Sequence, residues 1–114
     1  MKNQNKQYFE TALWSSIGND DEPLEENYSL EDLSDEIILK SEIEIDLFIE
    51  KAGSLLNGLE LSTVLHNFWL TRNHHGAGFW DGDYQKEVGE KLTKLSHDFG
   101  EVYLYVGDDG RLYL

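Results

Sequence analysis

The chain has 114 residues, the length of a single domain with a modest hydrophobic core, so residues 1–114 are treated as one unit. Its 39% hydrophobic and 12% aromatic residues are typical of globular rather than disordered proteins. With 23 acidic against 9 basic residues, the net charge is −14, and such a chain repels DNA, RNA and anionic membranes. The absence of cysteine excludes disulfides, thiolate metal sites and cysteine nucleophiles.

The distribution of apolar residues predicts a cytoplasmic protein. No apolar run approaches the roughly 20 residues that a membrane span needs. The first six residues lead into no apolar segment of the kind found in secretory signals.

A short amphipathic helix is expected near the N-terminus. Apolar residues between positions 8 and 14, among them Tyr8, Leu13 and Trp14, have spacings that place them on one helical face. The only proline of the chain, Pro23, lies in a polar segment that would end this region.

The negative charge is concentrated in residues 20–50. This segment contains thirteen acidic residues and one basic residue, Lys40, so it carries −12 of the −14. On a helix, like charges four residues apart cost roughly 0.2–0.5 kcal/mol each, and a helix selected only for stability would alternate the signs. The imbalance therefore favours a function for the charge, although acidity also keeps small proteins soluble.

Residues 35–56 are predicted to form the longest helix. Ser34 is an N-cap candidate followed by two carboxylates that favour the helix dipole. Asn57 and Gly58 would end the helix in a left-handed turn. The positions that repeat at helical spacing are Ile37, Ile38, Ser41, Ile45, Phe48, Ala52 and Leu55.

The stretch 66–81 is predicted to be a β-hairpin. Residues 64–71 are rich in β-forming side chains and can alternate between two faces, and residues 78–80 would form a short returning strand.

A further helix over residues 84–98 and a second hairpin, with strands 102–106 and 112–114, complete the predicted elements. The expected order is α-α-β-β-α-β-β. This is an α+β fold in which N-terminal helices, including the long acidic one, pack on a small antiparallel sheet.

Three histidines and a carboxylate in the predicted hairpin are the candidate metal ligands: His66, His74, His75 and Asp81. Their spacing matches no recognised ligand pattern, so no metal and no cofactor are predicted. Pairing of Asp81 or Asp83 with a histidine is no better supported as a catalytic site, and the protein is more readily explained as a non-enzyme. Residues 76–78 lack the pattern of a phosphate-binding loop and are interpreted as a turn.

The predicted sheet is unusually rich in aromatic residues. Two interpretations stay open: cross-strand packing under the long helix, or an exposed aromatic face in which Arg72 beside Trp69 forms a protein-binding hot spot. The aromatic residues concerned are Phe68, Trp69, Phe79, Trp80, Tyr103, Tyr105 and Tyr113.

The sequence from His66 to Asp81 reads His-Asn-Phe-Trp-Leu-Thr-Arg-Asn-His-His-Gly-Ala-Gly-Phe-Trp-Asp. It resembles the core His-x-Phe-Trp-Leu-Thr-Arg-Asn-x-His-Gly-Ala-Gly-Phe-Trp-Asp of a family of small acidic proteins encoded by bacteriophages and mobile elements. The similarity continues through residues 89–93 and 99–110, while the N-terminal half is similar mainly in its acidity. The resemblance implies a phage or mobile-element origin rather than a mechanism. Small acidic proteins of that origin are often inhibitors of host defence, which is an association and not a physical argument.

The leading hypothesis is therefore an acidic phage-type inhibitor that mimics nucleic acid, as an anti-CRISPR or anti-restriction protein would. Its expected partner is a basic, nucleic-acid-binding nuclease of the bacterial host, met in the host cytoplasm, with no direct binding of nucleic acid or membrane. The candidate partner-binding residues are Glu25, Glu26, Glu31, Asp32, Asp35, Glu36, Glu42, Glu44, Asp46, Trp69, Arg72, His75 and Trp80.

Two alternatives remain. The first is a small enzyme, or a ligand- or metal-binding protein, whose site is the hairpin, with His66, Arg72, His75 and Asp81 converging. The second is a phage structural or assembly protein that self-associates through exposed aromatic residues. The oligomeric state is left open.

Overall fold

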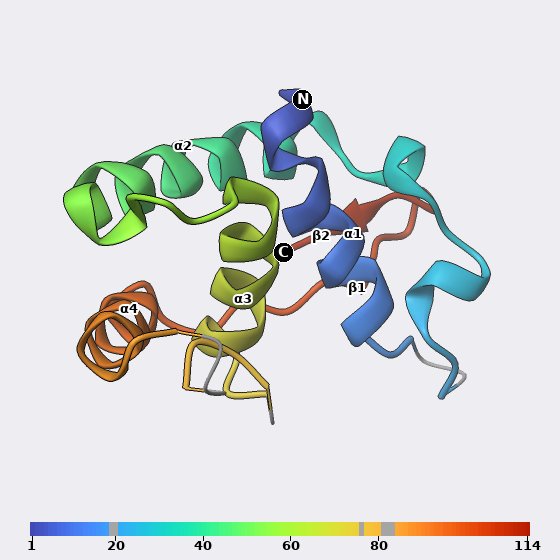
Figure 1. The fold of residues 1–114 in the computed structure, drawn as a ribbon. Helices are drawn as coiled ribbons and strands as arrows, with labels where there is room; N and C mark the ends of the chain where they lie inside the picture. Colours follow the sequence, from blue (N-terminus) through green and yellow to red (C-terminus); the bar gives the residue numbers. More distant parts are fainter. Residues whose placement is uncertain (19–20, 76, 81–83) are drawn as a thin grey trace.

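A computed structural model describes residues 1–18, 21–75, 77–80 and 84–114 of the chain (Figure 1). The helices and strands of these residues are α1 (Lys6–Ser15), α2 (Asp35–Ala52), α3 (Leu61–Arg72), α4 (Lys86–Asp98), β1 (Tyr105–Val106) and β2 (Leu112–Tyr113). Short 3-10 helices lie between them: η1 (Asn3–Asn5), η2 (Leu24–Glu26), η3 (Leu30–Asp32) and η4 (Gly53–Leu56). No helix in the described ranges is long and apolar enough to cross a membrane.

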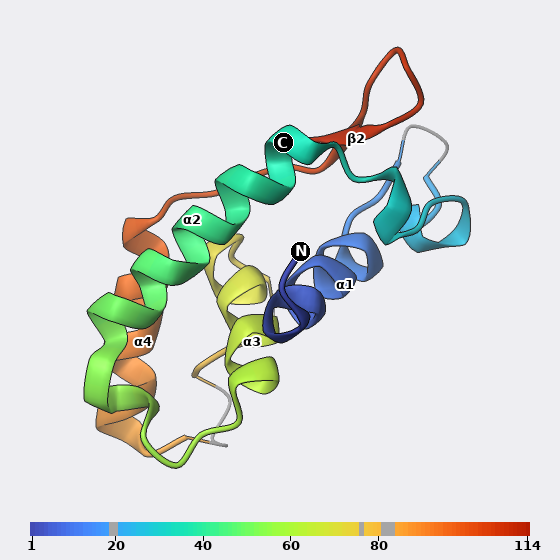
Figure 2. The ribbon, with the colours of Figure 1, turned by 90° about the horizontal axis from the view of Figure 1, so that it is seen from above.

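Helix α3 is the central element of the fold. Helix α1 packs along one side of α3 and α4 packs against another, while α2 passes over the top and also contacts α4 (Figures 1 and 2). The β1–β2 hairpin lies at one end of this arrangement, near the start of α2. The protein is thus mostly helical with a small antiparallel sheet, which confirms the α+β class in its broad form.

The two N-terminal helices were predicted correctly in type. In α1 the buried face includes Tyr8, Phe9 and Leu13, whereas Trp14 is exposed. In α2 the backbone N–H of Ile37 donates to Oγ of Ser34, the predicted N-cap, at 3.3 Å. The buried face of α2 comprises Ile37, Ser41, Ile45, Phe48 and Ala52.

Helix α2 ends earlier than expected. The last helical residue is Ala52, and Gly53 adopts a φ of +51°, after which the chain continues as η4 up to Leu56. Left-handed backbone of this kind is accessible to glycine at little cost. Gly58, where the left-handed stop was predicted, has a φ of +79° and ends the turn after η4 instead.

The hairpin predicted for residues 66–81 is wrong. Residues 61–72 form α3, and Gly78–Trp80 lie in a turn rather than a strand. Side chains on almost every side of the C-terminal half of α3 are buried, so its residues fit an alternating pattern as easily as a helical one. Local β-propensity is a weak preference that packing overrides. The predicted order α-α-β-β-α-β-β is therefore not confirmed, because helix α3 takes the place of the first predicted strand.

The C-terminal elements agree better with the prediction. Helix α4 spans Lys86–Asp98, and β1 pairs antiparallel with β2 in the register Tyr105↔Tyr113 and Val106↔Leu112. The strands are shorter than the predicted 102–106 and 112–114. The backbone N–H of Ser34 donates to the carbonyl of Leu112 at 3.1 Å, which attaches the hairpin to the start of α2.

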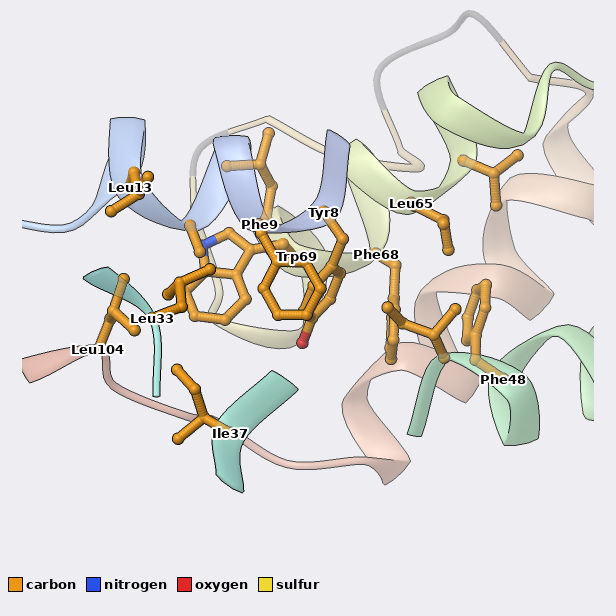
Figure 3. Close-up of a cluster of buried hydrophobic side chains, with 14 of the residues drawn as sticks. Tyr8, Phe9, Leu13, Leu33, Ile37, Phe48, Leu65, Phe68, Trp69 and Leu104 are labelled. Carbon is orange, nitrogen blue, oxygen red and sulfur yellow. The ribbon is translucent and has the colours of Figure 1, made fainter. Parts of the chain in front are cut away.

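The core lies between the helices rather than beneath the sheet (Figure 3). Phe48 of α2 stacks on Phe68 of α3 with ring centroids 4.0 Å apart, and Tyr8 meets Trp69 edge to face at 5.4 Å. Neither interpretation of the aromatic residues applies to all of them. Phe68, Trp69 and Phe79 belong to the core, whereas Trp80, Tyr103 and Tyr105 are exposed.

Candidate functional site

Arg72, proposed from the sequence as an interface residue, is fully buried at the end of α3. Its Nε donates to the carbonyl of Gly100 at 2.8 Å, and Nη2 donates to that of Phe99 at 3.0 Å. The Nη1 group donates to the hydroxyl of Tyr8 at 3.1 Å, and both Nη atoms contact the carboxylate of Glu44 at 3.2 Å. All donors of the guanidinium are used inside the protein, so Arg72 does not lie on a partner-binding surface.

The same contacts keep Arg72 charged. Burial lowers its pKa, but the neighbouring Tyr8 and Glu44 outweigh this effect, and the net pKa is raised. Burial in turn raises the pKa of Tyr8 to about 12, so its hydroxyl keeps its proton. The group formed by Arg72, Glu44 and Tyr8 is an internal link between α3, α2 and α1.

Trp69 is also a core residue rather than a surface anchor. It lies among the buried hydrophobic side chains (Figure 3). Its indole Nε1 donates to Oγ of Ser15 at 2.7 Å. The predicted hot spot of Arg72 beside Trp69 is therefore wrong, because both side chains are removed from solvent by the helical conformation of α3.

The histidines predicted to converge are separated. His66 faces α1, with Nδ1 2.7 Å from Oγ1 of Thr11, and burial lowers its pKa. The ring of His74 packs against that of His97 with centroids 4.4 Å apart, whereas His75 lines a hollow beside Trp69. The remaining candidates Asp81 and Asp83, together with Gly76 of the glycine turn, lie outside the described residues.

In the part of the chain that the structure describes, no three histidine, aspartate or glutamate side chains lie close enough together to hold a metal ion.

Four of the nine acidic candidates have partners within the chain. Glu44 binds Arg72, and Asp32 accepts from the backbone N–H of Ser29 at 2.9 Å. Glu42 accepts from the backbone N–H of Lys2 and from Nδ2 of Asn5, both at 2.8 Å. Burial raises the pKa of Glu42, but these hydrogen bonds outweigh it, and its net pKa is lowered. The fourth, Asp46, lies 3.6 Å from Nζ of Lys2.

The other five acidic candidates form an exposed group, which we call the acidic end. Within the described part of the chain, their side chains make no salt bridge or hydrogen bond. They lie on η2, on η3 and in the first turn of α2, at the end of the molecule that also carries the β1–β2 hairpin (Figure 2). The acidic end comprises Glu25, Glu26, Glu31, Asp35 and Glu36.

The outer face of α2 carries an exposed apolar stripe that was not predicted from the sequence. Leu39, Ile43 and Leu47 follow one another at four-residue intervals and expose 65%, 54% and 42% of their surface. Side chains at this spacing share one helical face. This four-residue spacing is visible in the sequence. The helix was predicted from the residues of its opposite, buried face, so the exposed apolar residues were not needed for that prediction. We call these three residues the α2 stripe.

Trp80 borders a cavity of about 640 Å³ that is lined by α4 on one side and by residues 79–80 and 84–85 on the other. Its side chain is 46% exposed. Of the aromatic and histidine candidates for partner binding, Trp80 and His75 thus keep contact with solvent, and they line different hollows.

Comparisons with known proteins found no matching family model, no similar curated protein and no similar solved structure.

Proposed function

We propose that this protein is an inhibitor that binds a basic, nucleic-acid-binding surface of another protein, as a DNA mimic does. The observation that carries the proposal is the acidic end: five exposed carboxylates with no cation partner in the described part of the chain. The resemblance of residues 66–81 to phage and mobile-element proteins suggests a host defence nuclease as the partner, in the manner of anti-CRISPR or anti-restriction proteins.

The acidic end has the electrostatic properties that such binding needs. Clustered charge of one sign steers a partner of opposite charge and accelerates association at low salt. A nucleic-acid-binding groove is lined with lysine and arginine side chains that normally contact phosphates. Carboxylates held on η2, η3 and the first turn of α2 would occupy these side chains and compete with the nucleic acid.

The α2 stripe would add affinity that charge alone does not give. Leu39, Ile43 and Leu47 continue from the acidic end along the same helix and are bordered by Asp46 and Glu50. Burial of apolar surface is favourable and only weakly sensitive to salt, in contrast to the carboxylates. The proposed interface therefore combines a salt-dependent acidic part with an apolar part.

Competition with DNA tests the proposal. Purified host nucleases, including CRISPR effector complexes and restriction enzymes, are bound to a labelled duplex, and displacement is followed by fluorescence anisotropy. We expect displacement from at least one nuclease, with an apparent affinity that falls steeply as salt rises. The triple variant Glu25→Gln, Glu26→Gln, Glu31→Gln should weaken displacement by about tenfold at low salt.

A matched triple variant controls for net charge. Glu87→Gln, Glu90→Gln and Asp98→Asn also remove three exposed carboxylates, all of which lie on α4. Displacement should be unchanged in this variant. Equal loss in both triple variants would show a nonspecific effect of charge, and failure to displace DNA from every nuclease would reject the proposal.

Self-association is a second candidate function, favoured by exposed apolar side chains on and near strand β1. Ile17 lies beside Tyr103 along one hollow and beside Tyr105 along another, and all three side chains are exposed. A phage assembly protein would use such a patch against a second copy. Light scattering tests it: a dimer that becomes a monomer on Tyr103→Ser supports assembly, and a monomer at all concentrations rejects it.

A further inference from the structure

The cavity beside α4 has the features of a small-molecule site. Its volume of about 640 Å³ falls within the range of typical ligand pockets, and its wall is largely apolar. One side is aromatic, with Phe79, Trp80 and Tyr84, and the other side is the face of α4 that carries Gly89 and Thr93.

The aromatic side is firmly attached to the rest of the protein. Phe79 is buried, and its backbone N–H donates to Oγ1 of Thr71 at 3.2 Å. The ring of Phe79 meets that of Tyr84 edge to face at 5.3 Å, and the hydroxyl of Tyr84 accepts from Nδ2 of Asn67 at 2.7 Å. The two aromatic residues that frame the cavity floor are therefore positioned by α3.

Small residues on α4 create the space. A Cβ at Gly89 would lie 2.5 Å from the carbonyl oxygen of Phe79, so glycine is required for this close approach of helix and segment. One turn later Thr93 folds its hydroxyl back onto the carbonyl of Gly89 at 2.7 Å. With no bulky side chain at either position, Trp80 faces a hollow rather than a packed wall.

Among the described residues, the α4 side of the cavity rim carries two positive and two negative side chains. Lys86, Glu90, Lys94 and Asp98 follow one another at four-residue intervals along α4, with alternating sign. Although this spacing allows ion pairs on a helix, none of the four forms a salt bridge in the part of the chain that the structure describes. Both hydrogen-bond donors and acceptors are thus available at the rim, in a protein whose net charge is −14.

From this geometry we propose that the cavity binds an uncharged planar heteroaromatic molecule, with the chemistry of a nucleoside. The flat ring stacks on Trp80 above the floor of Phe79 and Tyr84, and its polar edge exchanges hydrogen bonds with the alternating rim. The balanced charges on the α4 side of the rim offer no net attraction to an anionic group, and the negative field of the whole protein opposes one. The site is separate from the acidic end and does not depend on the proposed inhibition.

Binding is measured by calorimetry in all variants, and by tryptophan fluorescence in the wild-type protein, with adenosine, guanosine, cytidine and uridine as probes. We expect saturable binding of at least one nucleoside, and weaker binding of its 5′-monophosphate. Trp80→Ala should weaken binding by about tenfold or more, the effect of removing an aromatic stacking partner. Thr93→Leu should abolish binding because the larger side chain fills the hollow.

Lys91→Leu is the matched control for Thr93→Leu, because Lys91 is exposed on α4 and does not line the cavity. It should leave binding unchanged. If Thr93→Leu does not fold, the Trp80→Ala result decides alone. Absence of saturable binding by all four nucleosides overturns the proposal, as does binding that survives Trp80→Ala, since the ligand then lies elsewhere. Tighter binding of the monophosphate than of the nucleoside overturns the assignment of an uncharged ligand.

Discussion

Arg72 and Glu44 form a two-pronged ion pair in the interior, with Nη1 3.2 Å from Oε1 and Nη2 3.2 Å from Oε2. The arginine is fully buried, while 21% of the glutamate side chain remains exposed. The guanidinium also lies near the rings of Phe68 and Phe99, with centroids 5.3 and 5.8 Å from Cζ. This pair joins α2 to α3 and explains why one acid of the long helix is unavailable to a partner.

The first prediction concerns this pair. Glu44→Gln leaves a buried guanidinium without its counter-charge, and we expect it to lower the free energy of unfolding by about 3 kcal/mol, near the lower limit for a broken buried pair. Urea denaturation followed by circular dichroism measures the loss. Glu50→Gln, an exposed acid on the same helix, should change it by less than about 0.5 kcal/mol. Equal effects of the two substitutions would contradict the role assigned to Glu44.

The second prediction is that alanine in place of Gly89 destabilises the protein, although this exchange usually stabilises a helix. Alanine in place of glycine inside a helix normally stabilises by about 1 kcal/mol. Gly89→Ala should instead destabilise by about 1–3 kcal/mol, because its Cβ would lie 2.5 Å from the carbonyl oxygen of Phe79 and push the segment away from α4. The change in urea midpoint gives the sign. Glu90→Ala, at the next position of α4, is the control and should be nearly neutral; a stabilised Gly89→Ala would show that the close approach is not required.

The sequence was sufficient to predict three of the helices and the C-terminal hairpin. Caps such as Ser34 and a clear buried stripe identify α2, and the glycine-containing turn at 107–110 identifies the hairpin. Helix α3 was missed because Phe68, Trp69, Leu70, Thr71 and Arg72 are all buried, so no polar face shows its period. A central helix loses the signal on which amphipathic prediction depends.

The candidate site was predictable only as a region of the chain. The sequence locates the acidic segment but does not distinguish Glu44 from Glu36. Only the position of Arg72 in three dimensions shows that Glu44 is paired inside the protein, whereas Glu36 is exposed. The cavity also depends on contacts distant in sequence, since Phe79 approaches α4 only where Gly89 permits it.

The third prediction is a pH effect. Burial lowers the pKa of His66 below its ordinary value, which is about 6.5 in an unfolded chain. Between these two values the unfolded state binds more protons than the folded state, so the contribution of His66 to stability falls as the pH drops below about 6.5. Proton NMR titration should give a pKa under that value.

Comparison with His66→Gln isolates this contribution, because both proteins share the same carboxylates. The wild-type protein should lose more stability than His66→Gln when the pH is lowered from above to below about 6.5. Parallel losses in the two proteins would show that His66 titrates equally in the folded and unfolded states.

The fourth prediction is that the carboxylates of the acidic end do not stabilise the fold. Its exposed carboxylates have no cation partner in the described part of the chain, so they repel one another. Glu25→Gln, Glu26→Gln, Glu31→Gln should therefore equal or exceed the wild-type stability, by up to about 0.5 kcal/mol at low salt. Added salt should stabilise the wild-type protein more than this variant, because screening replaces the neutralisation.

The matched triple variant should behave in the opposite way. Glu87, Glu90 and Asp98 lie four residues from lysines on α4, so Glu87→Gln, Glu90→Gln, Asp98→Asn removes attractive as well as repulsive pairs and should not gain stability. Urea midpoints of the three proteins across a salt series give the comparison. If neutralising the acidic end stabilises the fold but weakens displacement of DNA, its carboxylates contribute to binding rather than to stability. If neutralising the acidic end destabilises the protein instead, its carboxylates serve the fold, and the proposed interface loses its main support.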